Sequence, residues 1–180
     1  MPITADQRWR ILAAVKAITV NDFGKNFEPI YERAHQSIGD FPHRADLEIR
    51  NGLSHFFRAI TAKVYQESAL DIIRARRHIR FAIYLCLVQM IERQLLRSLA
   101  VIETLNERNV DTKKMLRRRQ KITNRLKQVR PISLEPRSKK SDLLRDIAGV
   151  TLTNIQLELA LLEVNELCVD LQKERRGLSS

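Results

Sequence analysis

Three side chains whose chemistry suits phosphodiester cleavage stand within six residues of one another. Arg50, Asn51 and His55 lie in a run, residues 47–58, that otherwise has the composition of a helix. A histidine near its ordinary pKa can give or take a proton at neutral pH. An arginine can hold a phosphate by two parallel hydrogen bonds, and an asparagine can orient either group. The set suits attack of an RNA 2′-hydroxyl on its own phosphate, which needs no metal ion.

The helix that must position these residues is predicted from about His43 to about Tyr65. Its apolar residues recur every three or four positions and predict one buried face: Ile49, Leu53, Phe56, Ile60 and Val64. At about 100° per residue, Asn51 and His55 fall on the opposite side, with Glu48 close to them. We therefore expect His55 to point away from the chain's own core on this helix, towards solvent, another helix or a second copy. Glu48 is a weaker candidate for the same site.

A second feature is a concentration of positive charge between residues 113 and 140. The segment contains twelve basic residues and one acid, Glu135, so its charge of +11 equals the formal charge of the whole chain. Such an excess attracts a polyanion at long range, and the absence of aromatic residues favours phosphate contact over base stacking. A solvated helical surface is the simpler alternative. The predicted nucleic-acid-binding residues are Lys113, Lys114, Arg117, Arg118, Arg119, Lys121, Arg125, Lys127 and Arg130.

The composition predicts an all-α bundle of about five to six helices, two of them long. Glycine and proline are few, with five of each in 180 residues, and helix-forming residues dominate. A capping box at Thr4 opens the first helix, and breaks are expected at 21–25 and 39–42. Ser68 is expected to cap a long helix that ends at about residue 107. A fifth helix is expected to end near residue 129, and Ser141 is expected to cap the last helix. We expect one domain with a core at 1–107, a basic hairpin and loop at 108–140, and a long helix at 141–177.

The remaining signals point to a cytoplasmic protein without a cofactor. Cys86 and Cys168 lie in apolar helical patterns, which favours reduced thiols over a disulfide. The first ten residues lack the apolar core of a signal peptide, and the run 81–90 is too short to span a bilayer. His35, His43 and His78 form no metal-ligand spacing with the cysteines. A second basic cluster, at the start of the long helix, could line the same cleft as His55 or form a solvated face: Arg74, Arg76, Arg77, His78 and Arg80.

The residues around His55 resemble the motif of the HEPN domains. Arg50-Asn51-Gly52-Leu53-Ser54-His55 fits that family's pattern of an arginine, four to six residues and a histidine, with a polar residue directly after the arginine. The resemblance implies an all-α bundle in which Arg50 and His55 are catalytic and Asn51 supports them. It also implies a homodimer with two motifs facing across a cleft. Many members are metal-independent endoribonucleases of toxin–antitoxin, phage-defence and RNA-processing systems.

Two functions follow as expectations. The first is a HEPN-like endoribonuclease, acting as a dimer on RNA, for which an antitoxin or defence protein is a conceivable partner. The second is a non-enzymatic scaffold or adaptor that binds nucleic acid through residues 113–140. Association with a membrane surface is not expected, because the fifth helix has only a thin apolar stripe.

Overall fold

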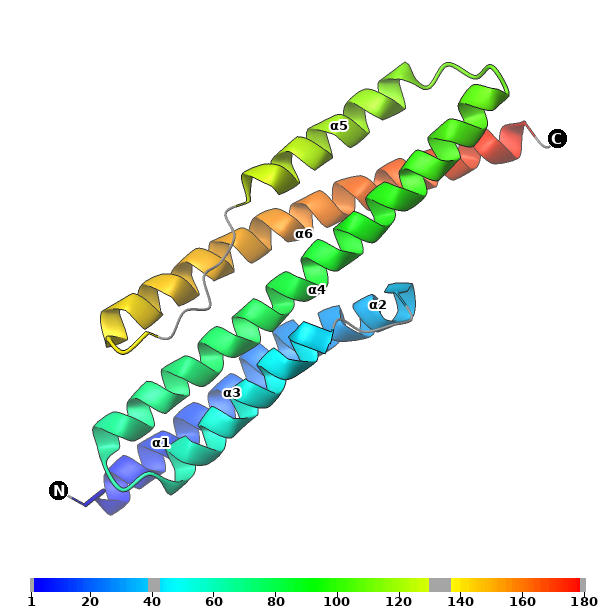
Figure 1. Ribbon diagram of the computed structural model, residues 1–180. Coiled ribbons are helices and arrows are strands. Elements are labelled where there is room, and N and C mark those ends of the chain that lie inside the picture. The colour runs from blue at the N-terminus through cyan, green and yellow to red at the C-terminus, as the bar shows by residue number, and fades with distance from the viewer. Residues whose placement is uncertain (1, 39–42, 130–136, 179–180) are drawn as a thin grey trace. The chain divides into compact units, whose positions relative to one another are not determined.

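The chain folds into an all-α helical bundle (Figure 1). The computed structural model describes residues 2–38, 43–129 and 137–178, and no strand occurs among them. The helices are α1 (Ala5–Ile18), the π-helix η1 (Thr19–Phe27), α2 (Glu28–Ile38), α3 (His43–Thr61), α4 (Tyr65–Glu107), α5 (Lys113–Gln128) and α6 (Lys140–Gly177). The two long helices, α4 and α6, have 43 and 38 residues. The predicted fold class is therefore confirmed.

Two compact units make up the bundle. Unit 1 contains residues 1–86 and 132–154, and unit 2 contains residues 87–131 and 155–180. Both α4 and α6 contribute residues to each unit, so these boundaries fall inside helices and not at residues 107 and 140. The expectation of one domain stays a prediction. Each unit has an apolar core: Ile11, Phe27, Ile30, Phe56, Ile79, Leu143 and Ile147 in unit 1, and Leu87, Ile91, Ile102, Ile122, Val164, Leu167 and Leu171 in unit 2.

The first helices match their sequence signals except at the expected break. Thr4 accepts a hydrogen bond from the Gln7 backbone amide, and Gln7 accepts one from the Thr4 amide, which confirms the capping box. The expected break at residues 21–25 is wrong, because the chain continues there as η1 despite Gly24. The break at 39–42 lies outside the described residues.

The wider turn of η1 places a carboxylate inside unit 1. Asp22 is buried, and its oxygens lie 3.0 Å from Arg76 Nε and 2.6 Å from Arg80 Nη2, both on α4. Arg77 pairs with Asp146 of α6 at 3.0 Å. Arg76, Arg77 and Arg80 of the basic cluster therefore form ion pairs within unit 1, a role that neither sequence interpretation of the cluster predicted.

The later boundaries lie close to the predicted ones. Tyr65 begins α4, so Ser68 is not its N-cap; the buried Ser68 hydroxyl instead donates a 2.7 Å hydrogen bond to the Ala59 carbonyl of α3. The predicted turn at 109–112 is present, with Asn109 at a φ of 58°. Lys140 begins α6, one residue before the expected cap, and Gly177 ends it.

Helix α3 buries a different face from the one predicted. Ile49 and Phe56 are buried, but Leu53 is 50% exposed, and Ile60 and Val64 are also exposed. The buried side instead carries the small residues Ala45, Gly52 and Ala59, spaced by seven. Small side chains let two helices approach closely, whereas Leu53 would hold them apart.

The partner of this small-residue face is an equivalent row on α4. Ser68, Ala75 and Ala82 are fully buried and are also spaced by seven. The Ser68–Ala59 hydrogen bond joins one end of the two rows. At the centre, a Cβ added to Gly52 would lie 3.3 Å from the Ala75 carbonyl oxygen. The two helices run antiparallel (Figure 1), and the short distance at Gly52 means that they pack closely there.

Candidate functional site

His55 lies against α4 and not in open solvent. Its Nδ1 is 2.9 Å from an oxygen of Asp71, and its side chain is 16% exposed while that of Asp71 is 11% exposed. The expectation that His55 points away from its own helix's core was wrong, because its side of α3 is the buried one. Of the three alternatives considered, another helix is the one that His55 meets.

A second histidine makes the reciprocal contact. Nδ1 of His78, on α4, lies 2.5 Å from an oxygen of Glu48, on α3. Glu48 is buried, and the His78 side chain is 19% exposed. The rings of His55 and His78 stack with centroids 5.3 Å apart and planes at 15°. Each helix thus supplies one carboxylate and one histidine; we call these four residues the histidine pair site.

The geometry follows from a repeated spacing. Glu48 and His55 are seven residues apart on α3, and Asp71 and His78 are seven apart on α4. Seven residues are about two helical turns, so each carboxylate shares a face with its histidine. Because the helices run antiparallel, the carboxylate of each meets the histidine of the other. The close contact at Gly52 lets these short side chains span the gap.

The carboxylates determine which ring nitrogens remain for chemistry. In the neutral imidazole, an Nδ1–H that donates to a carboxylate leaves Nε2 as the acceptor. A carboxylate at this position also orients the ring and stabilises the imidazolium when it forms, as in catalytic triads. Both histidine side chains are partly exposed, so solvent reaches part of each ring.

Burial tunes His55 towards its neutral form. Desolvation is the largest influence and lowers its pKa below the ordinary 6.5. The hydrogen bond that His55 donates to Asp71 opposes this shift of the pKa, and the charges of His78 and Arg58 add to the shift. At neutral pH His55 is therefore a neutral base.

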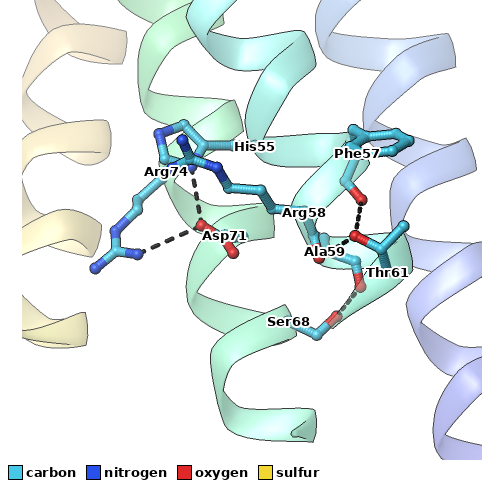
Figure 2. Close-up of polar contacts among 8 residues, drawn as sticks. All are labelled: His55, Phe57, Arg58, Ala59, Thr61, Ser68, Asp71 and Arg74. Carbon is cyan, nitrogen blue, oxygen red and sulfur yellow. Dashed lines mark hydrogen bonds and ion pairs between the residues drawn. The ribbon is translucent and has the colours of Figure 1, made fainter. Parts of the chain in front are cut away.

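Two arginines lie beside the pair. Arg74 Nη1 is 3.4 Å from the Asp71 oxygen that also contacts His55. Figure 2 shows the Arg74 guanidinium reaching Asp71 and the Arg58 side chain running from α3 towards His55. Both side chains reach solvent, so they can meet an anion at the edge of the ring pair.

Two of the other predicted catalytic residues, Arg50 and Asn51, lie apart from this arrangement. Arg50 Nη2 is 3.1 Å from Asp46, one helical turn back, and its side chain is 73% exposed. Asn51 is exposed, and within the described residues no hydrogen bond joins it to His55. Glu48 belongs to the site, but through His78. The structure brings together only His55 and Glu48 of the four predicted residues.

The basic helix α5 divides into two sets of cations. Three arginines face unit 2: Arg118 is 2.7 Å from Asp170, Arg125 is 2.6 Å from Glu163, and Arg119 donates to the Leu95 carbonyl at 3.1 Å. The remaining cations are exposed and form no ion pair within the described part of the chain: Lys113, Lys114, Arg117, Lys121 and Lys127. At about 100° per residue these five share one side of α5. Arg130 lies outside the described residues.

Neither a metal cluster nor a disulfide accompanies the site in the described ranges. They contain no group of three or more histidine, cysteine or acidic side chains placed to hold a metal ion. Both cysteines are free thiols, and burial raises the pKa of Cys86 to about 12. One described helix, α6, is long and apolar enough to cross a bilayer, a property shared by core helices of water-soluble proteins.

Comparisons with known proteins add no family assignment. No family model, no curated protein and no solved structure matches this chain. The resemblance to HEPN domains therefore depends on the Arg50–His55 motif.

Proposed function

We propose that this chain is a HEPN-like, metal-independent endoribonuclease that acts as a homodimer, with His55 and His78 as its proton-transfer pair. The observation that carries the proposal is the histidine pair site: two stacked, partly exposed imidazoles, each oriented by a carboxylate through Nδ1. Two such rings with adjacent arginines have the groups that RNA transesterification needs.

The reaction assigns one proton to each ring. Neutral His55 accepts the proton of the RNA 2′-hydroxyl through Nε2 while the 2′-oxygen attacks phosphorus. The phosphorus–O5′ bond breaks, and the imidazolium of His78 donates its Nε2 proton to the departing oxygen. A 2′,3′-cyclic phosphate and a 5′-hydroxyl result, and proton exchange with water restores both rings. Arg58 and Arg74 stabilise the negative charge on the phosphoryl oxygens.

An exposed face of α3 supports the homodimer. Leu53, Phe57 and Ile60 are exposed at spacings of four and three, and Phe57 is 70% exposed. Arg50 stands three residues before Leu53 on the same side, so a second copy that covered this face would approach Arg50. We therefore assign Arg50 a role at the interface between two copies of the chain and not within one copy.

Cleavage of a fluorescent single-stranded RNA in the presence of a chelator tests the proposal. His55→Ala and His78→Ala are each expected to slow cleavage by about 10²–10⁴-fold, the usual contribution of a general acid or base. Free imidazole is expected to restore part of the rate to His55→Ala, which a misfolded protein would not show. The control is His35→Ala, whose residue lies on α2 and stacks on Tyr31 instead. An RNA carrying a 2′-deoxy sugar at the cleavage site should resist.

The results separate the enzyme from its alternatives. Wild-type protein that cuts no RNA would contradict the enzymatic proposal. Unchanged cleavage by His78→Ala would show that the second ring has only a structural role. A mass spectrum without a cyclic phosphate end would exclude this reaction.

A second candidate function is binding of a polyanion without cleavage. It is supported by the five exposed cations on one side of α5, which leave phosphate-binding groups free. Binding of RNA by a His55→Ala, His78→Ala protein, combined with no cleavage by wild type, would favour this adaptor function.

A further inference from the structure

The outer face of α6 carries an apolar stripe that its own unit does not cover. Ile155, Leu159, Leu162 and Val169 are each more than half exposed. Their spacings of four, three and seven match the seam of a coiled coil. The opposite side of this part of α6 is already buried in unit 2 through Leu157, Leu161, Val164, Leu167 and Leu171. The helix therefore has a second apolar face beyond the one that its fold uses.

A groove lies next to the middle of this stripe. It runs between the end of α5 and α6 and has a volume of about 580 Å³. Leu126 and Val129 line one wall, and Leu157, Leu159 and Ala160 line the other. An apolar side chain on a helix lying along the stripe has a place to insert, which is how most helix-in-groove contacts gain affinity.

The charge of this segment is opposite to that of the whole chain. Residues 146–172 contain five acids and no lysine or arginine, whereas the chain carries +11. Glu163 and Asp170 pair with arginines of α5. Glu158 and Glu166 are exposed, and neither forms an ion pair in the described ranges. Glu166 also takes the seam position between Leu162 and Val169, where a partner would have to meet its charge.

We propose that this face binds an amphipathic, basic helix of a partner protein. The partner presents apolar residues at heptad spacing and a lysine or arginine opposite Glu166, which sets its register. Nucleic acid and anionic lipid are repelled by Glu158 and Glu166. A second copy of α6 would bring these like charges together, and α5 of a second copy exposes cations but few apolar residues. The proposal goes beyond RNA cleavage and assigns a separate surface to protein recognition.

A designed peptide pair tests it directly. The probe is a three-heptad helical peptide with leucine at the seam positions and lysine at the flanking positions; its matched control has glutamate in place of lysine. Fluorescence anisotropy with the full chain is expected to show binding of the lysine peptide and at least about tenfold weaker binding of the glutamate peptide. Glu166→Lys is expected to reduce the preference for the lysine peptide over the glutamate peptide, or to reverse it.

Substitutions on α6 locate the site. The double variant Leu159→Ser, Leu162→Ser is expected to weaken binding of the lysine peptide by about tenfold or more. The control is Leu96→Ser, which removes an equally exposed leucine from α4 in the same unit. All these residues are exposed, so the fold should survive, as circular dichroism can verify.

Several outcomes would overturn the proposal. The proposal fails if the lysine peptide does not bind, or if both peptides bind equally well. It also fails if Leu96→Ser weakens binding of the lysine peptide as much as the Leu159, Leu162 double variant does. Self-association that the Leu159, Leu162 double variant abolishes would identify a second copy as the occupant. Binding to phosphatidylserine vesicles that the same variant abolishes would identify a membrane.

Discussion

At the scale of residues, the histidine pair site couples a candidate catalytic group to the stability of unit 1. His55 is held in its neutral form by burial, while Asp71 stabilises the proton on Nδ1. Such a pair can serve catalysis and packing at once. The two roles respond differently to pH, which allows them to be distinguished.

The free energy of unfolding is expected to fall as the pH drops through 6.5. The folded pKa of His55 is lowered, so the unfolded chain takes up its proton at a higher pH than the folded one. Between the two pKa values the unfolded state binds more protons, and stability rises with pH; the contribution of His55 is complete above 6.5 and is lost below it. Urea unfolding from about pH 8 to about pH 5 measures this dependence.

The matched variants are His55→Gln and His35→Gln. His55→Gln is expected to make the free energy of unfolding depend less on pH, because glutamine does not titrate. His35→Gln is expected to keep more of the wild-type dependence on pH. An unchanged slope in His55→Gln would show that burial does not lower this pKa.

The motif alone could predict one half of the site. Arg50, Asn51 and His55 stand out in the sequence because they are polar and adjacent. His78 was predicted only as a member of the basic cluster at residues 74–80 that could line the same cleft as His55, and its contact with Glu48 was not predicted. A usable signal was present: an acid seven residues before a histidine occurs in two consecutive helices, as Glu48–His55 and Asp71–His78. Reading it required knowing that the helices run antiparallel with their small residues in contact.

At the scale of elements, helix existence could be predicted well and helix orientation could not. The periodic apolar residues, the capping box and the turn before α5 all predicted correct boundaries to within a few residues. The buried face of α3 was wrong because alanine and glycine contribute little to an apolar pattern. The paired histidines and carboxylates, meanwhile, look like a solvated face. Close packing at Gly52 determines which face of α3 is buried, and nothing in the hydrophobic pattern indicated this close packing.

Two glycine substitutions test this close packing. Gly149 of α6 has no atom within 4 Å of an added Cβ, so Gly149→Ala is expected to raise the free energy of unfolding by about 0.5–1 kcal/mol through helix propensity. Gly52→Ala has the same gain in propensity, but its Cβ would lie 3.3 Å from the Ala75 carbonyl oxygen. We expect it to gain less than Gly149→Ala or to lose stability in urea unfolding. An equal gain at both positions would contradict the close approach of α3 and α4.

At the scale of the whole molecule, the chain concentrates its charge on separate surfaces. The exposed side of α5 is cationic, and the exposed side of α6 is apolar and acidic. A polyanion and a basic protein would therefore select different surfaces of unit 2. Net charge alone, at +11, would have predicted only the first.

Charge reversal on α5 is expected to weaken RNA binding and its salt dependence together. Lys113→Glu, Arg117→Glu and Lys121→Glu remove three exposed cations that recur every four residues. If each contacts one phosphate of a single strand, the slope of log affinity against log salt becomes shallower by about 2, at about 0.7 per phosphate. Filter binding at several salt concentrations measures this.

The control carries the same change in net charge on other helices. Arg8→Glu, Lys16→Glu and Lys25→Glu replace three exposed cations of α1 and η1. A comparable loss of slope in this control would show that net charge, and not the α5 surface, determines binding.

The order of synthesis gives the short connection between α3 and α4 a further consequence. Every member of the histidine pair site lies within residues 48–78, on two helices joined by a three-residue link. Contacts so near in sequence close small loops and form quickly during folding. On the ribosome, the pair site can therefore assemble before α5 has been translated. The proposed proton-transfer pair would form first, and the exposed cations of α5 would follow.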